Sequence, residues 1–223
     1  MNQPIPLSQK LYLLGIHPEK GGLISASYQT MNFILIGAVL LELFLNKNII
    51  FEEKRVVFQN DKTNNPLHKL ILDKISQKPK PLKVSVWINK LQYSQRLIKK
   101  AVQQGLVEKR LINMQPRQFL FFKWRKSELL NRQVVYHLLS DIENQIFKGT
   151  ENIEDIMLLS MLKPARLIKR IFPEKEKRMR ATEKLKQMML SNQVSEAVTQ
   201  AIAAAQSVAA SVAISAAVAG AHR

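Results

Sequence analysis

Residues 31–45, MNFILIGAVLLELFL, decide the fold of this 223-residue chain. The stretch is apolar nearly throughout, but it has about 15 residues where a membrane-spanning helix needs roughly 20. It also contains Asn32 and Glu42, two polar side chains that are unfavourable in hydrocarbon. We therefore predict a buried core helix on which the rest of a single domain packs.

Five further segments carry apolar residues at intervals of three and four, which is typical of helices that pack on a core. They are residues 8–16, 65–75, 84–105, 127–147 and 152–163. Two short β-branched and aromatic runs around a charged turn, in residues 48–61, predict a small hairpin. The predicted fold class is mainly α, a single helical domain over residues 1–172 with two short β-hairpins.

The second hairpin is predicted after Gly105, a residue that suits a helix C-cap. Residues 106–114 and 117–124 supply its strands, and Gln115-Pro116 supplies the turn. Period-two alternation then places Leu120, Phe122 and Trp124 on one face, and Phe119 and Phe121 on the other. Since both faces carry aromatic side chains, one of them must contact something other than the helices or remain in water.

The remaining residues, 173–223, form a basic and then Ala-rich extension. We expect it to be helical or disordered. Its weak apolar stripe, which can pack on the core or on a second copy of the chain, consists of Val194, Val198, Ile202, Val208 and Val212. Residues 197–221 are uncharged and long enough to cross a bilayer, but they are mostly Ala and Ser, which gain little in lipid, so no membrane span is predicted.

Positive charge dominates the chain, with 34 Lys and Arg against 17 Asp and Glu and a net charge of +17. The excess lies in two blocks, residues 54–132 and residues 163–186. Such an excess favours a polyanionic partner, either nucleic acid or anionic lipid. The chain has no Cys, which excludes disulfides and thiolate metal sites, and its first residues lack the order of a secretory signal. We predict a cytoplasmic protein.

No pattern typical of catalysis is present. The four His are scattered without a metal-ligand spacing, and there is no Gly-rich phosphate loop or glycine-flanked nucleophile. The acidic pairs Glu52-Glu53 and Glu154-Asp155 are adjacent, so their side chains diverge on a strand or a helix. We therefore expect no enzyme activity, no metal and no cofactor.

Three kinds of binding protein remain open. The basic helix before the second hairpin, together with that hairpin, is similar to a winged helix that contacts DNA. A membrane-surface protein uses the same cations on lipid phosphates and the hairpin aromatics at headgroup level. A protein-interaction scaffold uses both for a protein partner.

The order of the segments narrows this choice. LSQKLYLLGI, then GAVLLELFL, then QRLIKKAVQQGLVEKR with its hairpin, then ENIEDIMLLSMLK, resembles the Golgi phosphoprotein 3 family from about Leu7 to Phe172. The resemblance implies a mostly helical domain with a protruding hairpin that docks on membranes by binding phosphatidylinositol 4-phosphate. In eukaryotes, proteins of this family resemble adaptors that retain glycosyltransferases in the Golgi.

This chain departs from the headgroup pocket of that family, which combines a Trp with several Arg. Ser27 stands near the Trp position, with Tyr28 beside it, and the pocket arginines are replaced by Ile36, Leu91 and Ser94. Each lost cation removes charge-assisted hydrogen bonds to phosphate. We therefore expect that the chain does not bind this headgroup in the manner of the family.

A diffuse basic patch is predicted in place of the pocket. Arg96, Lys99 and Lys100 share one side of their helix because residues three and four apart are neighbours. The other candidate anion-binding side chains are Lys109, Arg110 and Arg117 on the hairpin, together with Tyr28. The candidate membrane contacts are Phe119 and Phe121. The predicted function is peripheral membrane association through an anionic lipid, with a phosphoinositide as the family's ligand. A homo-oligomer and a membrane-protein partner remain open, and nucleic acid is less favoured.

Overall fold

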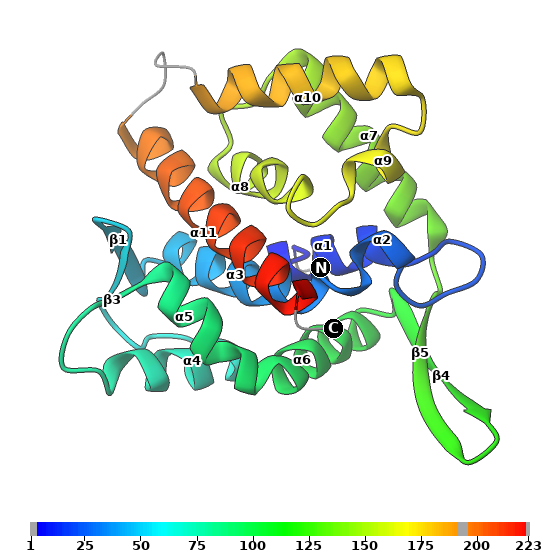
Figure 1. Ribbon diagram of the computed structural model, residues 1–223, viewed down its shortest axis with the longest axis horizontal. Coiled ribbons are helices and arrows are strands. Elements are labelled where there is room, and N and C mark those ends of the chain that lie inside the picture. The colour runs from blue at the N-terminus through cyan, green and yellow to red at the C-terminus, as the bar shows by residue number, and fades with distance from the viewer. Residues whose placement is uncertain (1–3, 191–195, 222–223) are drawn as a thin grey trace.

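A computed structural model describes residues 4–190 and 196–221, with side chains for residues 4–190 and 203–220 (Figure 1). Its fold is mainly α, as predicted. The central helix is α3 (Met31–Leu45), with the bounds of the quoted stretch, and twelve of its fifteen residues are buried. A helix that is apolar on all sides requires partners on all sides. Its surroundings therefore determine the architecture.

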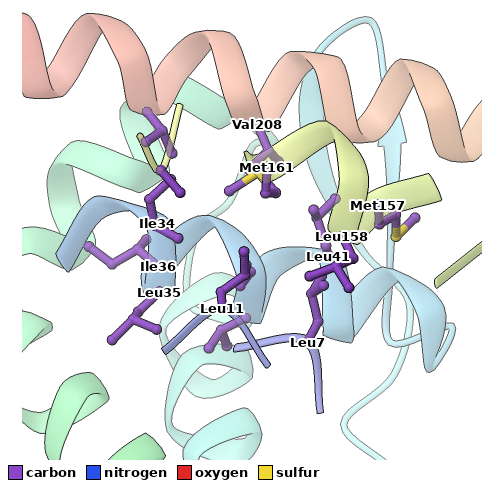
Figure 2. Close-up of a cluster of buried hydrophobic side chains, with 14 of the residues drawn as sticks. Leu7, Leu11, Ile34, Leu35, Ile36, Leu41, Met157, Leu158, Met161 and Val208 are labelled. Atoms are coloured by element: carbon purple, nitrogen blue, oxygen red, sulfur yellow. The ribbon is translucent and has the colours of Figure 1, made fainter. Parts of the chain in front are cut away.

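Four helices form the central apolar cluster of the core. Side chains from α1 (Leu7–Gly15), α3, α8 (Ile153–Leu162) and α11 (Glu196–Ala221) converge in Figure 2, among them Leu11, Ile34, Leu158 and Val208. Each of these four is essentially inaccessible to solvent. Burial of one such side chain stabilises the fold by about 1.5–3 kcal/mol.

One buried carboxylate interrupts the apolar surface of α3. Glu42 Oε1 accepts a hydrogen bond from the backbone N–H of Ser8 at 2.7 Å, at the start of α1. Its Oε2 lies within hydrogen-bond distance of His68 Nε2, at 2.8 Å. His68 belongs to α4 (Pro66–Ser76), so Glu42 joins three helices.

The other helices follow the sequence prediction with local differences. The predicted helix over residues 84–105 is divided by a 3-10 turn. The predicted helix over residues 127–147 begins later, after Asn131. The Asn131 side chain caps this helix by accepting hydrogen bonds from Gln133 N–H and Val134 N–H. Asn65 and Asn152 cap α4 and α8 in the same way. The remaining helices are α2 (Ser25–Tyr28), α5 (Val84–Leu91), η1 (Gln92–Ser94), α6 (Gln95–Glu108), α7 (Arg132–Lys148), α9 (Ile168–Ile171) and α10 (Lys175–Leu190).

The first predicted hairpin is confirmed as β1 (Ile49–Glu52) and β2 (Arg55–Phe58). Its two-residue turn, Glu53-Lys54, has positive φ at both positions, which matches the twist of a tight hairpin. A third strand, β3 (Leu82–Lys83), pairs antiparallel with β2 and was not predicted.

The second hairpin is confirmed, but its predicted turn is wrong. The strands are β4 (Ile112–Phe119) and β5 (Phe122–Leu129), and the turn lies at Leu120-Phe121. Pro116 is instead inside β4, opposite Arg125, which a two-stranded hairpin tolerates because each strand has an open edge that needs no N–H.

Gly105 does not end its helix either. Helix α6 continues to Glu108, and Gly105 lies inside it. A Cβ at this position would collide with Gln9 Nε2 of α1. This glycine inside the helix therefore leaves room for the Gln9 side chain rather than forming a C-cap.

A polar cluster holds the base of the second hairpin against the helices. The hydroxyls of Tyr12 and Ser127 share a hydrogen bond of 2.7 Å, and Gln103 Nε2 donates to the Tyr12 hydroxyl at 2.6 Å. The backbone N–H of Gly22 donates to the Ser127 carbonyl at 2.7 Å. Gly21 takes a φ of 65°, and a Cβ there would lie 2.8 Å from the same carbonyl, so only glycine fits. Helices α1 and α6 and the loop after α1 thus fix the hairpin.

The C-terminal extension is helical and packs on the core. Helix α11 crosses in front of α3 in Figure 1 and contacts α3, α5 and α8. Val208 and Val212 of the predicted stripe are buried. Val194 lies outside the described residues, as do the side chains of Val198 and Ile202.

By length and composition alone, the described part of the chain contains one helix that could cross a membrane, over Ala203–Gly220 of α11. A third of this window is buried in the fold. The expectation that the segment does not span a bilayer stays a prediction.

We predict that Gly37→Ala loosens α11. A Cβ at residue 37 would lie 2.6 Å from Val208 Cγ1 and 3.1 Å from Met161 Cε, so α11 must shift, although Ala favours helix by about 1 kcal/mol over Gly. Hydrogen exchange should show faster exchange across α11 and little change in α4. Adding Val208→Ala should restore part of the protection; protection unchanged in the single variant would contradict this packing.

A second prediction concerns Tyr12. Burial raises the pKa of its hydroxyl above the ordinary 10.0, although the hydrogen bonds to Ser127 and Gln103 act the other way. Because the folded state holds this proton more tightly than the unfolded state, the resulting stabilisation is present below pH 10 and is lost as pH rises through the folded-state pKa. Tyr12→Phe should lower the free energy of unfolding by about 1–2 kcal/mol at neutral pH. In urea titrations this difference should shrink above pH 10; a constant difference would argue against a raised pKa.

Candidate functional site

The second hairpin projects away from the helices (Figure 1) and ends in apolar side chains. Its tip, residues 119–122 (FLFF), consists of four large apolar residues that are all strongly exposed. Phe121 at the turn is 96% exposed, and Trp124 behind the tip is 48% exposed. A hairpin that only completed its own fold would bury such side chains.

The register separates aromatic from basic side chains. Phe119 pairs with Phe122 and Arg117 pairs with Trp124, so these aromatics share one face of the ribbon. The pairs Gln118–Lys123 and Pro116–Arg125 occupy the other face. The prediction that placed Phe119 and Phe122 on different faces of one strand is therefore wrong. The turn at residues 120–121 puts them on two paired strands, and directly paired residues share a face. Near the tip, one face therefore carries the aromatics together with Arg117, and the other face carries Lys123 and Arg125.

The turn itself uses an unusual residue. Leu120 takes a φ of 51°, in the left-handed region that residues other than Gly and Asn seldom adopt. Asn or Gly would fit this backbone with less strain. Folding alone does not explain an exposed Leu at such a position. The residue therefore points to a role of its side chain in contact with a binding partner.

Arg117 is less available to an anion than predicted. Its Nη2 lies 2.6 Å from Glu128 Oε1 on the same face of the hairpin, where both side chains are partly exposed. The paired carboxylate offsets much of the positive charge that Arg117 would otherwise present to a bound anion. Lys123 and Arg125, which are exposed on the other face, were not among the predicted anion-binding residues, and Lys123 is closer to the tip than Arg117.

The predicted cluster on α6 divides by exposure. Arg96 and Lys100 are exposed, whereas Lys99 is half-buried and its pKa is lowered by burial. On the helix, Lys99 is only about 60° from the direction of the buried residues Ile98, Val102 and Leu106. Arg96 and Lys100 are therefore the two members of this cluster that directly face an approaching anion.

Lys109 and Arg110 lie at the other end of the helix. At 1.5 Å per residue, α6 places Arg110 about 20 Å from Arg96. Both residues line a groove of about 1460 Å³ between the segment before α1 and helices α4, α6 and α7. Glu42 and Glu108 line the same groove, so it presents no uniformly positive wall. The predicted cations form a chain along α6 and the hairpin rather than one pocket.

The positions that the sequence resemblance aligned with the family's headgroup pocket are mostly buried. Ile36, Leu91 and Ser94 are buried, and Ser27 is buried with its hydroxyl donating to the Ala165 carbonyl at 2.8 Å. Only Tyr28, on the short helix α2, is exposed. Among the described residues, these positions form no exposed pocket.

Sequence reasoning missed part of the apolar surface. Leu120, Phe122 and Trp124 were not among the predicted membrane contacts, yet all are exposed. The signal that would have found them is the four-residue apolar run FLFF, which is too long for a half-buried strand and marks a tip. No group of three or more His, Cys, Asp or Glu side chains within the described ranges is placed to hold a metal ion.

Comparison with known proteins identifies the family of the chain. No curated protein sequence matches the chain. The family model of Golgi phosphoprotein 3 (GPP34) matches residues 7–205, which is most of the chain and extends past Phe172 into α11. The division at residue 172 remains a prediction, while the matched range includes α3, α6, the protruding hairpin and α8. The chain belongs to the Golgi phosphoprotein 3 (GPP34) family.

Proposed function

We propose that this chain is a peripheral membrane protein that binds anionic lipid through the hairpin tip and the cations behind it. The observation that carries this proposal is the tip itself, where four exposed apolar side chains stand at the end of a projection. Membership of the GPP34 family, a family associated with lipid and membrane interaction, supports the same class of ligand.

Insertion of the tip is energetically reasonable. Moving one Phe or Leu side chain from water into an apolar environment contributes about 1.5–3 kcal/mol. Two or three such side chains suffice for reversible binding of a protein to a bilayer. Because Tyr12, Gln103 and Ser127 fix the base of the hairpin, little orientational freedom is lost when the tip inserts.

The cations supply attraction over a longer range. Lys and Arg near an anionic surface contribute about 1 kcal/mol each, and this contribution weakens as salt screens the charges. Lys123 and Arg125 follow the tip directly, and Arg96 and Lys100 lie exposed on α6. Arg117 contributes less because of its ion pair with Glu128.

Phosphatidylinositol 4-phosphate is the finer proposal that family membership suggests. In this chain the pocket positions are buried, so a phosphoinositide would be bound through its high negative charge rather than by a shaped pocket. We therefore propose modest preference among anionic lipids of equal charge, a binding rather than a catalytic role, and a cytoplasmic location at the membrane surface.

Two sets of substitutions separate insertion from attraction. The triple change of Arg96, Lys99 and Lys100 to Ala should weaken vesicle binding by roughly 1 kcal/mol per fully exposed residue, and it should reduce the dependence on salt. The double change of Phe119 and Phe121 to Ser should weaken binding to a degree that salt hardly alters. Co-sedimentation with vesicles across a salt series measures both.

A charge-matched control comes from α10. Changing Lys175, Lys184 and Lys186 to Ala removes the same charge from another exposed surface and should affect binding less than the α6 triple. Equal losses would show that only net charge matters. Sequence-selective DNA binding in a gel shift at matched salt, without vesicle binding, would instead support the winged-helix alternative.

Leu120→Asn provides a sharper test of the tip. Asn tolerates the φ of 51° better than Leu, so the hairpin should be at least as stable as before. Vesicle binding should nevertheless fall, because an apolar side chain at the tip has been replaced by a polar one. Thermal unfolding and co-sedimentation measure the two effects. Unchanged binding would mean that Leu120 makes no contact with lipid.

A further inference from the structure

A second group of exposed apolar side chains lies where α5 passes into α6. Tyr93 in η1 is 97% exposed, and Leu97, one turn further in α6, is 58% exposed. Neither side chain packs on the domain as its neighbours Leu91 and Ile98 do. We call Tyr93 and Leu97 the η1–α6 corner.

This corner is surrounded by positive charge. From Lys74 to Val107 the chain contains eight Lys and Arg and not one Asp or Glu. Lys90, Arg96 and Lys100 flank the two apolar side chains in sequence, and all three are exposed. An apolar pair within an acid-free basic stretch is complementary to an anionic surface with an apolar layer beneath it.

The corner and the hairpin belong to one rigid unit. Helix α6 packs on α1 and α3 through Ile98, Val102 and Leu106, and Leu97 lies on its outer side. In Figure 1, α6 runs along the lower edge of the molecule, and the hairpin extends from the same edge. Only three residues separate α6 from β4, and Leu130 N–H donates to the Leu111 carbonyl at 3.0 Å to close this junction.

We propose that the η1–α6 corner is a second lipid contact, which enters the headgroup region of the same anionic bilayer that receives the hairpin tip. This inference rests on the proposed function and extends it by a site. Tyr suits that depth because its ring is apolar and its hydroxyl reaches water.

A bilayer explains this corner better than a protein partner does. A stable protein interface buries about 800 Å² on each side and usually has a fully desolvated centre. Two apolar side chains on a convex turn, spaced among cations, offer no such centre. A fluid lipid surface needs no complementary shape.

Two contacts on one rigid body have a consequence for orientation. The tip alone would let the domain pivot on the membrane, whereas tip and corner together hold α6 at the surface. The second contact then forms at a high effective concentration once the first is made. The α6 cations are thereby held next to the lipid phosphates.

The absence of Cys allows a direct test in the full chain. Tyr93→Cys, Phe121→Cys and Tyr136→Cys each create one attachment point for an environment-sensitive fluorophore. Tyr136, in α7, is 61% exposed and serves as the matched control. With vesicles of phosphatidylcholine and phosphatidylserine, the emission of the labels at 93 and 121 should shift to the blue. Quenching by spin-labelled lipid should be shallow at 93 and deeper at 121, while the label at 136 stays unchanged.

Affinity gives an independent readout. The double change of Tyr93 and Leu97 to Ser should weaken co-sedimentation by roughly tenfold, with the salt dependence retained. Tyr136→Ser should leave binding unchanged. Circular dichroism of each variant shows whether the fold is intact, as the exposure of all three residues leads us to expect.

The outcomes distinguish this inference from the proposed function. A blue shift at 121 without one at 93 overturns the second contact and leaves the membrane function standing. No vesicle binding by the unmodified chain overturns both. A shift at 93 that depends on protein concentration and needs no vesicles assigns the corner to self-association and overturns its contact with lipid.

Discussion

The buried carboxylate of Glu42 is the interaction on which the position of the functional surface depends. Helix α1 begins at Leu7 and has no side-chain cap at Pro6, and the Ser8 N–H is satisfied by Glu42 Oε1. An unpaired N–H in this interior would cost about 1–3 kcal/mol. The other carboxylate oxygen holds His68 of α4. Helix α1 in turn carries Tyr12, whose hydroxyl holds the base of the hairpin, so a contact in the core determines where the tip points.

The molecule combines a rigid body with apolar side chains left in water. Large apolar residues are exposed at the hairpin tip and at the η1–α6 corner, while the central helix α3 is buried almost completely. Soluble domains seldom expose contiguous apolar side chains that have no partner. The rigid base matters because a flexible hairpin would fold back and bury its aromatics on the nearest helix.

The sequence predicted those features that follow from local pattern. Three-and-four spacing located the helices, and the apolar run 31–45 located the core. Turn chemistry failed at the second hairpin because Gln115-Pro116 is a common turn pair, whereas the real turn uses Leu120 at a positive φ that no propensity suggests. The exposure of Arg96 and Lys100 follows from helix geometry. The burial of Lys99 and the pairing of Arg117 with Glu128 depend on tertiary packing and strand register, which the sequence does not display.

The burial of Ile36 explains why this position, which the family resemblance aligns with a pocket arginine, cannot carry a cation in this chain. Gly37 faces Val208 and Met161 at distances that leave no room for a Cβ, and the preceding residue, Ile36, is buried. An Arg at position 36 would place a charge in this apolar cluster, where an unpaired ion costs several kcal/mol. The burial of position 36 in the core and a basic pocket at this position are therefore mutually exclusive. The lipid binding proposed above therefore relies on surfaces that lie outside the core, namely the hairpin and the exposed side of α6.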